Sequence, residues 1–104
     1  MAFDTEPVQY QKTALSDLQG AWGNLRDAVV ESVPFPEWER LLFHIDEGMS
    51  WESVRNLERM RRTMLLIENI VRQSDCPSEV EEWVDMVRNE LQDVLEEIAA
   101  GKLT

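Results

Sequence analysis

Hydrophobic residues recur at intervals of three and four along most of this chain, and that spacing limits the fold more than any other feature. The most regular example, near the C-terminus, consists of Val80, Val84, Val87, Leu91, Val94 and Ile98. This spacing puts apolar side chains on one side of an α-helix, whereas a half-buried β-strand needs strict alternation of apolar and polar residues. No stretch of the sequence alternates in that way. We therefore expect an all-α protein.

Three breaks divide this pattern into four predicted helices. Pro34 and Pro36 interrupt it first, Gly48 interrupts it next, and a polar segment follows at 74–79. Proline and glycine favour turns over helix interiors, so these breaks set the boundaries. The predicted helices span residues of about 6–31, 36–47, 51–73 and 79–100.

Capping residues support these boundaries. Gly48 stands where the second helix would end, and Ser50 precedes the third helix as an N-cap would. Ser78 begins a capping-box pattern at the start of the fourth helix, and Gly101 follows its end. The connections between the helices are therefore short, which favours antiparallel neighbours.

The length of the chain suits one bundle of this kind. A chain of 104 residues with 43% hydrophobic residues can bury a single core. We predict that residues 1–104 form one helical domain, an antiparallel bundle of three long helices and one short helix.

Composition also suggests a compartment. The longest uninterrupted apolar run, Met64–Ile67, is far shorter than the ~20 residues that cross a bilayer, so we expect no membrane span. The single cysteine, Cys76, excludes an internal disulfide bond and suits a reducing environment. The expected location is the cytoplasm.

The fourth predicted helix is strongly acidic. Eight carboxylates fall within 79–97, which gives about one charge per 3.4 Å of helix axis, a density close to that of phosphates along one DNA strand. This helix could imitate DNA and bind a basic partner, or its charges could form an ordinary solvated face. The candidate partner-binding residues are Glu82, Asp85, Glu90, Asp93, Glu96 and Glu97.

The third predicted helix carries most of the positive charge. On an ideal helix, Arg55, Arg59 and Arg62 share one face, and Leu66 and Ile70 follow on the same side. These five residues could bind a partner or a second copy of the chain. Alternatively, the helix is central and buried on two sides, and its arginines face carboxylates of the acidic helix.

No residue pattern indicates catalysis or a cofactor. His44 is the only histidine and has no second histidine or cysteine pair to complete a metal site. Cys76 lacks the neighbours of a catalytic thiol. We therefore expect no enzyme activity, metal or cofactor. The formal net charge of −11 also argues against direct binding of nucleic acid.

These features favour a non-enzymatic acidic binding protein. The main hypothesis is a small inhibitor or adaptor that docks on a basic surface of a protein partner. A concrete version is a phage-type anti-defence protein, such as an anti-CRISPR protein or DNA mimic, that blocks a nucleic-acid-handling complex. Two alternatives remain: a chaperone or assembly partner that holds an amphipathic helix, and a structural homo-oligomer, for instance a dimer, without an external ligand.

Overall fold

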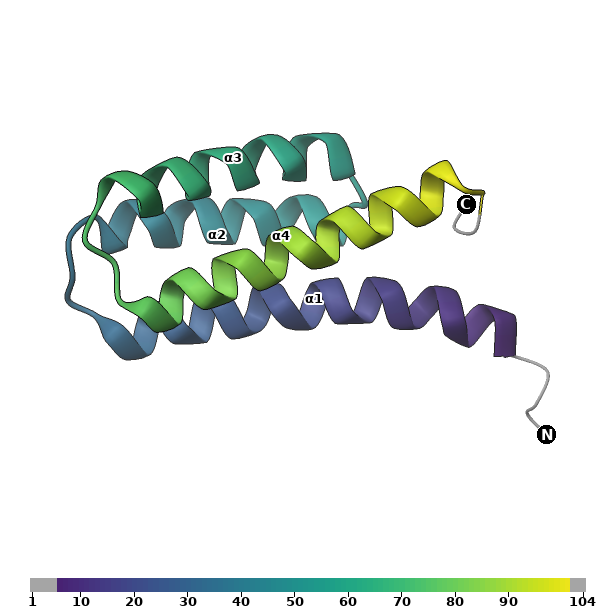
Figure 1. The fold of residues 1–104 in the computed structure, drawn as a ribbon, viewed down its shortest axis with the longest axis horizontal. Coiled ribbons are helices and arrows are strands. Elements are labelled where there is room, and N and C mark those ends of the chain that lie inside the picture. Colours follow the sequence, from purple (N-terminus) through teal and green to yellow (C-terminus); the bar gives the residue numbers. More distant parts are fainter. Residues whose placement is uncertain (1–5, 102–104) are drawn as a thin grey trace.

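The computed structural model describes the backbone of residues 6–101 and the side chains of residues 15–101. Within these residues the protein is all-α, with four helices and no strand. They are α1 (Glu6–Ser32), α2 (Trp38–Ser53), α3 (Leu57–Gln73) and α4 (Ser78–Ala99). Successive helices run in opposite directions, as expected for short connections (Figure 1).

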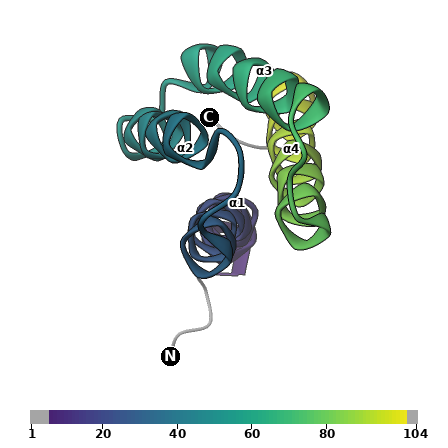
Figure 2. The same ribbon diagram turned by 90° about the vertical axis from the view of Figure 1, so that its left-hand side faces the viewer.

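The four helices surround a common core. Viewed from one end, they follow one another around the bundle in the order α1, α2, α3, α4 (Figure 2). Each helix packs against the next, and α4 returns to pack against α1. The contact between α1 and α4 is the most extensive, and that between α3 and α4 is the smallest.

The predicted apolar stripes form most of this core. In α1 the stripe supplies Leu18, Trp22, Leu25 and Val29, and in α4 it supplies Val80, Val84, Val87, Leu91 and Val94; all are buried. Ile98 continues the stripe in sequence but is 42% exposed, because it lies in the last turn of α4. Helical periodicity thus identifies the buried face of these two helices correctly.

Gly48 does not end α2, contrary to the sequence prediction. The helix continues through this residue to Ser53. Gly48 is buried against the indole ring of Trp22 on α1, and a Cβ atom at this position would lie 2.7 Å from Cζ2 of that ring. Because glycine has no side chain, it lets α1 and α2 approach each other closely at this point.

The turn between α2 and α3 consists of Val54, Arg55 and Asn56. Arg55 has a left-handed backbone with φ of 60°, and its N–H donates to the carbonyl of Glu52 at 3.0 Å. The N–H of Asn56 donates to the carbonyl of Trp51 at 2.9 Å, which completes a Schellman motif. Asn56 then caps α3, because its Oδ1 accepts a hydrogen bond from the N–H of Arg59 at 3.2 Å.

This turn corrects three sequence predictions. Ser50 is not an N-cap, since it lies inside α2. Arg55 is not on α3, because its positive φ places it in the turn. Finally, α2 with 16 residues is nearly as long as α3 with 17, so the expected division into three long helices and one short helix is not confirmed.

The other helix ends show one success and two differences. Gly101 follows α4 with φ of 79°, as a terminating glycine should. Ser78, however, is the first residue of α4 rather than its cap, and no side chain caps this end. Helix α2 begins at Trp38 and not at Pro36, because Glu37 has a φ of 67° that no right-handed helix accommodates.

Candidate functional site

The acidic residues predicted from the sequence do not all face the same way. Glu82, Asp93 and Glu96 are exposed on the outer side of α4, and Glu90 and Glu97 are half-buried. Asp85 is also exposed, but it lies on the side of α4 near α3, where it pairs with Arg88 at 3.3 Å. The structure therefore separates Asp85 from the other five.

Glu90 connects these carboxylates to α1. Its pKa is raised above the ordinary value, mainly by burial and then by the negative charges of Asp17 on α1 and Asp93 on α4. Asp17 was not among the predicted site residues, because pairing of distant helices cannot be read from one helix alone. We call the resulting surface the acidic face; it consists of Asp17, Glu82, Glu90, Asp93, Glu96 and Glu97.

The acidic face includes a shallow depression near the C-terminal end of α4. Its lining residues are Asp93, Glu96, Glu97 and Ala100, and its volume is about 330 Å³. Glu96 is oriented by Gln92, whose Nε2 donates to its Oε2 at 3.1 Å. Three carboxylates thus converge on a surface that water, or a basic side chain from outside, can reach.

Basic side chains do not neutralise this face within residues 15–101. The ion pair of Arg26 is with Asp46 on α2, at 2.8 Å. Arg88, the only base on α4, pairs with Asp85 and with Glu68 on α3. No ion pair among the described side chains involves a carboxylate of the acidic face.

An exposed apolar residue lies among these carboxylates. Met86 is 41% exposed and stands one helical turn from both Glu82 and Glu90. Trp83 precedes it by three residues and is partly buried against the core. Sequence reasoning missed Met86 as a candidate, although its position outside the apolar stripe of α4 was a usable signal.

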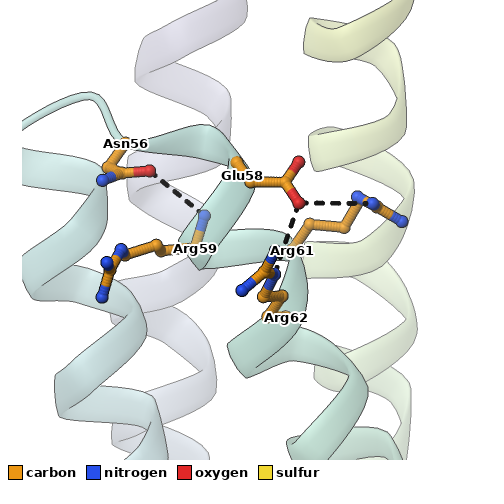
Figure 3. Close-up of polar contacts among 5 residues, drawn as sticks. All are labelled: Asn56, Glu58, Arg59, Arg61 and Arg62. Carbon is orange, nitrogen blue, oxygen red and sulfur yellow. Dashed lines mark hydrogen bonds and ion pairs between the residues drawn. The ribbon is translucent and has the colours of Figure 1, made fainter.

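The predicted pairing of α3 arginines with α4 carboxylates is wrong. The ion pair that joins these helices in the described structure has the opposite polarity, with Arg88 Nη1 of α4 at 3.6 Å from Glu68 Oε2 of α3. Arg61 and Arg62 instead lie 3.7 and 3.3 Å from Glu58 on their own helix (Figure 3). The arginines of α3 are therefore partly neutralised locally.

The five residues predicted as a second site on α3 are also separated. Arg55 lies in the turn, whereas Arg59 and Arg62 are exposed on the helix. Leu66 is 46% exposed, but Ile70 is only 3% exposed and belongs to the core. The prediction of a joint Leu66–Ile70 patch is wrong, because Ile70 turns toward the interior.

A second feature of the described surface is a groove between α3 and α4. It has a volume of about 370 Å³ and is open to solvent; its lining residues are Glu68, Val71, Arg72, Ser74, Glu81, Val84, Asp85 and Arg88. The lining mixes both charges, and the Arg88–Glu68 pair spans it. This groove therefore has neither the apolar lining nor the convergent polar groups typical of a small-molecule site.

His44 and Cys76 form no catalytic arrangement in the described structure. His44 Nδ1 lies 3.0 Å from Glu47 Oε1, one turn away in the interior of α2. The pKa of the Cys76 thiol is raised, mainly by burial and then by Glu81 and Asp75, which lowers the fraction of nucleophilic thiolate. No group of three or more His, Cys, Asp or Glu residues among those described is arranged to bind a metal ion.

Comparison of the chain with protein-family models, curated proteins and solved structures finds no match. Among the described residues, none of the helices combines the length and apolar character needed to span a membrane.

Proposed function

We propose that the protein is a non-enzymatic binding protein whose acidic face docks on a basic surface of a partner protein. The observation that supports this most strongly is the gathering of carboxylates from α1 and α4 on one exposed surface without basic partners among the described side chains. A basic partner would supply the missing cations.

The raised pKa of Glu90 points in the same direction. Burial and the neighbouring charges of Asp17 and Asp93 make the ionised form of Glu90 less stable than an isolated carboxylate. A lysine or arginine from a partner would relieve this repulsion, so the free protein holds an electrostatic cost that binding removes. Such a charged face also speeds association with an oppositely charged partner, most strongly at low salt.

Met86 gives the acidic face a source of affinity besides charge. Exposed methionine is flexible and adapts to differently shaped apolar surfaces. Charge would guide the encounter, and contact with Met86 would lengthen the lifetime of the complex.

The biological form of this proposal is a small inhibitor or adaptor in the cytoplasm. The carboxylate density along α4 resembles that of DNA phosphates, so a basic groove that normally holds nucleic acid is a suitable target. An anti-defence protein that blocks a nucleic-acid-handling complex would act in this way.

The test is partner capture with matched charge variants. Tagged wild-type protein would recover the partner from the native host, and the affinity of the purified pair would then be measured at low and high salt. Asp93→Lys with Glu96→Lys should weaken binding about 100-fold. Glu39→Lys with Asp75→Lys changes the net charge equally, lies outside the acidic face and should change affinity by less than about threefold.

Thermal melts of both double variants separate binding from folding. The four substituted side chains are exposed, so the melting temperatures should stay close to that of the wild type. Undiminished binding by the Asp93→Lys, Glu96→Lys variant would refute the proposal.

A further inference from the structure

The side of the bundle opposite the acidic face carries the most exposed aromatic residue of the described chain. Phe43 on α2 is 64% exposed, and Leu66 on the adjacent helix α3 is 46% exposed. Helices α2 and α3 lie across the bundle from the surface shared by α1 and α4 (Figure 2). Two large apolar side chains are thus presented to solvent on a side that the acidic face does not include.

The contact between Arg59 and Trp51 sets the register of α2 against α3. The guanidinium of Arg59 lies over the Trp51 ring, 5.2 Å from its centroid. Moving seven residues away from the turn along each antiparallel helix leads to His44 on α2 and Leu66 on α3. Seven residues are about two helical turns, so His44 and Leu66 face each other as Trp51 and Arg59 do.

This register brings Phe43, the residue before His44, to about the level of Leu66 along the α2–α3 seam. The ring of Phe43 meets the ring of His44 edge to face, with centroids 5.3 Å apart and an interplanar angle of 76°. His44 is held in turn by Glu47. The Phe43 ring therefore packs against an imidazole that is 17% exposed and is itself held by a contact with Glu47.

Arginines border these apolar side chains. Arg62 stands four residues before Leu66 on α3 and pairs with Glu58 at 3.3 Å. Arg59 extends toward α2 rather than toward Glu58, as Figure 3 shows, and has no carboxylate partner among the described side chains. We call this surface the arginine face; it consists of Phe43, His44, Trp51, Arg59, Arg62 and Leu66.

We propose that the arginine face docks an acidic amphipathic helix of a partner protein. Phe43 and Leu66 offer apolar contacts to anchors at i and i+3 or i+4 of such a helix, and Arg59, about two turns from Leu66 along α3, would lie near position i+7. Carboxylates flanking those anchors would reach Arg59 and Arg62. An arginine already stacked on an aromatic ring loses little side-chain freedom when it accepts a carboxylate.

This inference does not depend on the proposed function, because the two surfaces share no residue. If both are correct, the protein is an adaptor that holds a basic partner on one side and an acidic helix on the other.

The test uses a designed peptide and the full chain. A fluorescent peptide of about 18 residues would carry leucines at i, i+3, i+4 and i+7 with glutamates beside them, and a control peptide would have lysine for each glutamate. Fluorescence anisotropy should show binding of the acidic peptide at least about tenfold tighter than that of the lysine peptide.

Two adjacent leucines provide the matched protein variants. Leu66→Ser and Phe43→Ala should each weaken binding of the acidic peptide about tenfold. Leu65→Ser should leave it unchanged, because Leu65 is 52% exposed but lines a hollow on the α4 side of the same helix. Asp93→Lys with Glu96→Lys should not weaken peptide binding, which separates this test from that of the acidic face.

Three outcomes would overturn the inference. The first is equal binding of the two peptides, or equal loss with Leu65→Ser and Leu66→Ser. The second is a wild-type dimer in sedimentation that Phe43→Ala dissociates, which would assign the surface to a second copy. The third is salt-sensitive duplex DNA binding that Arg59→Ala abolishes while the acidic peptide fails to bind, which would assign it to nucleic acid.

Discussion

The acidic face and the arginine face differ in how their charges are accommodated within the protein. On the arginine face, Arg62 has Glu58 on its own helix and Arg59 has the ring of Trp51. On the acidic face, Glu90 has like charges at Asp17 and Asp93 and a raised pKa. The charges of Arg59 and Arg62 thus have stabilising neighbours within the protein, whereas the charge of Glu90 does not.

The difference teaches that exposed charges can have opposite effects on stability, depending on the groups around them. Removing a charge from the arginine face should destabilise the protein slightly, whereas removing one from the acidic face should stabilise it. The acidic face therefore has the stronger electrostatic drive to bind, because a partner can supply what the fold lacks, whereas the arginine face depends more on its exposed apolar side chains.

The largest predicted effect tests where the arginine face ends. Ile70 lies one turn beyond Leu66 on α3 but is buried in the core. Ile70→Ser should lower the free energy of unfolding by about 3–4 kcal/mol, since it leaves a cavity and buries a hydroxyl. Leu66→Ser should lower it by only about 1 kcal/mol, because the Leu66 side chain is 46% exposed. Urea denaturation of the two variants measures this, and equal losses would place Leu66 in the core.

The next effect concerns the contact between α1 and α2. This contact positions α2, which carries part of the arginine face, relative to α1, which carries part of the acidic face. Gly48→Ala should destabilise the protein by about 1–3 kcal/mol, because the added methyl overlaps the Trp22 ring. Gly23→Ala on α1 is the control, since a Cβ there meets nothing within 4 Å. It should stabilise the protein by up to about 1 kcal/mol through helix propensity. Thermal unfolding would reveal the opposite signs, and two stabilising substitutions would contradict the close approach.

A smaller effect is expected on the arginine face itself. Arg59→Ala should lower the free energy of unfolding by about 0.5–1 kcal/mol, because it removes the cation–π contact with Trp51. Arg72→Ala also removes one positive charge from α3, but Arg72 contacts only the Asn69 side chain among the described hydrogen bonds. Its effect should be near zero. Tryptophan fluorescence during unfolding would report both values, and matching losses would argue against a specific role of the ring.

The smallest predicted effect is a gain in the free energy of unfolding, and its size depends on pH. Glu90→Gln should stabilise the protein by about 0.2–0.5 kcal/mol at pH 7, because it removes a like charge beside Asp17 and Asp93. Since folding raises the pKa of Glu90, the folded state binds its proton more tightly than the unfolded state. The contribution of Glu90 to the stability of the wild type should therefore fall as the pH rises from the ordinary carboxyl pKa through the raised value.

Denaturation of wild type and Glu90→Gln from pH 4 to pH 7 would measure this difference. The gap between them should widen with pH and then level off. Asp85→Asn is the matched control, because Asp85 pairs with Arg88 and its loss should not stabilise the protein. A gap that narrows with rising pH would contradict the assignment.

Sequence periodicity predicted the all-α fold and the buried faces of α1 and α4, because a long helix with one apolar stripe has one way to bury it. The glycine at position 101 also predicted the end of α4, and it adopts the positive φ that favours glycine. These features depend on local residue spacing, so a single sequence contains enough information to find them.

The errors arose where a residue type has two structural uses. Glycine often ends a helix, but Gly48 instead packs in space against Trp22, which lies 26 positions earlier in the sequence. The actual stop uses Arg55 in a conformation that residue preference assigns to glycine. Because the turn lies later in the sequence than predicted, it includes Arg55, which is therefore not on the helix that carries Arg59 and Arg62.

The candidate site was predicted only in part for the same reason. The outward carboxylates of α4 follow from the helix pattern, but the contribution of Asp17 needs the pairing of α1 with α4. Leu66 and Ile70 have nearly the same angular position on an ideal helix, and only the packing of α2 against α3 decides which of them is buried.

The order of the helices around the bundle also has a kinetic consequence. The arginine face is built on α2 and α3, which are consecutive and joined by a three-residue turn, so it needs only a local hairpin. The acidic face needs the first and last helices to meet, which closes a loop through the rest of the chain at a greater entropic cost. During folding, we expect the surface for an acidic helix to exist before the surface for a basic partner.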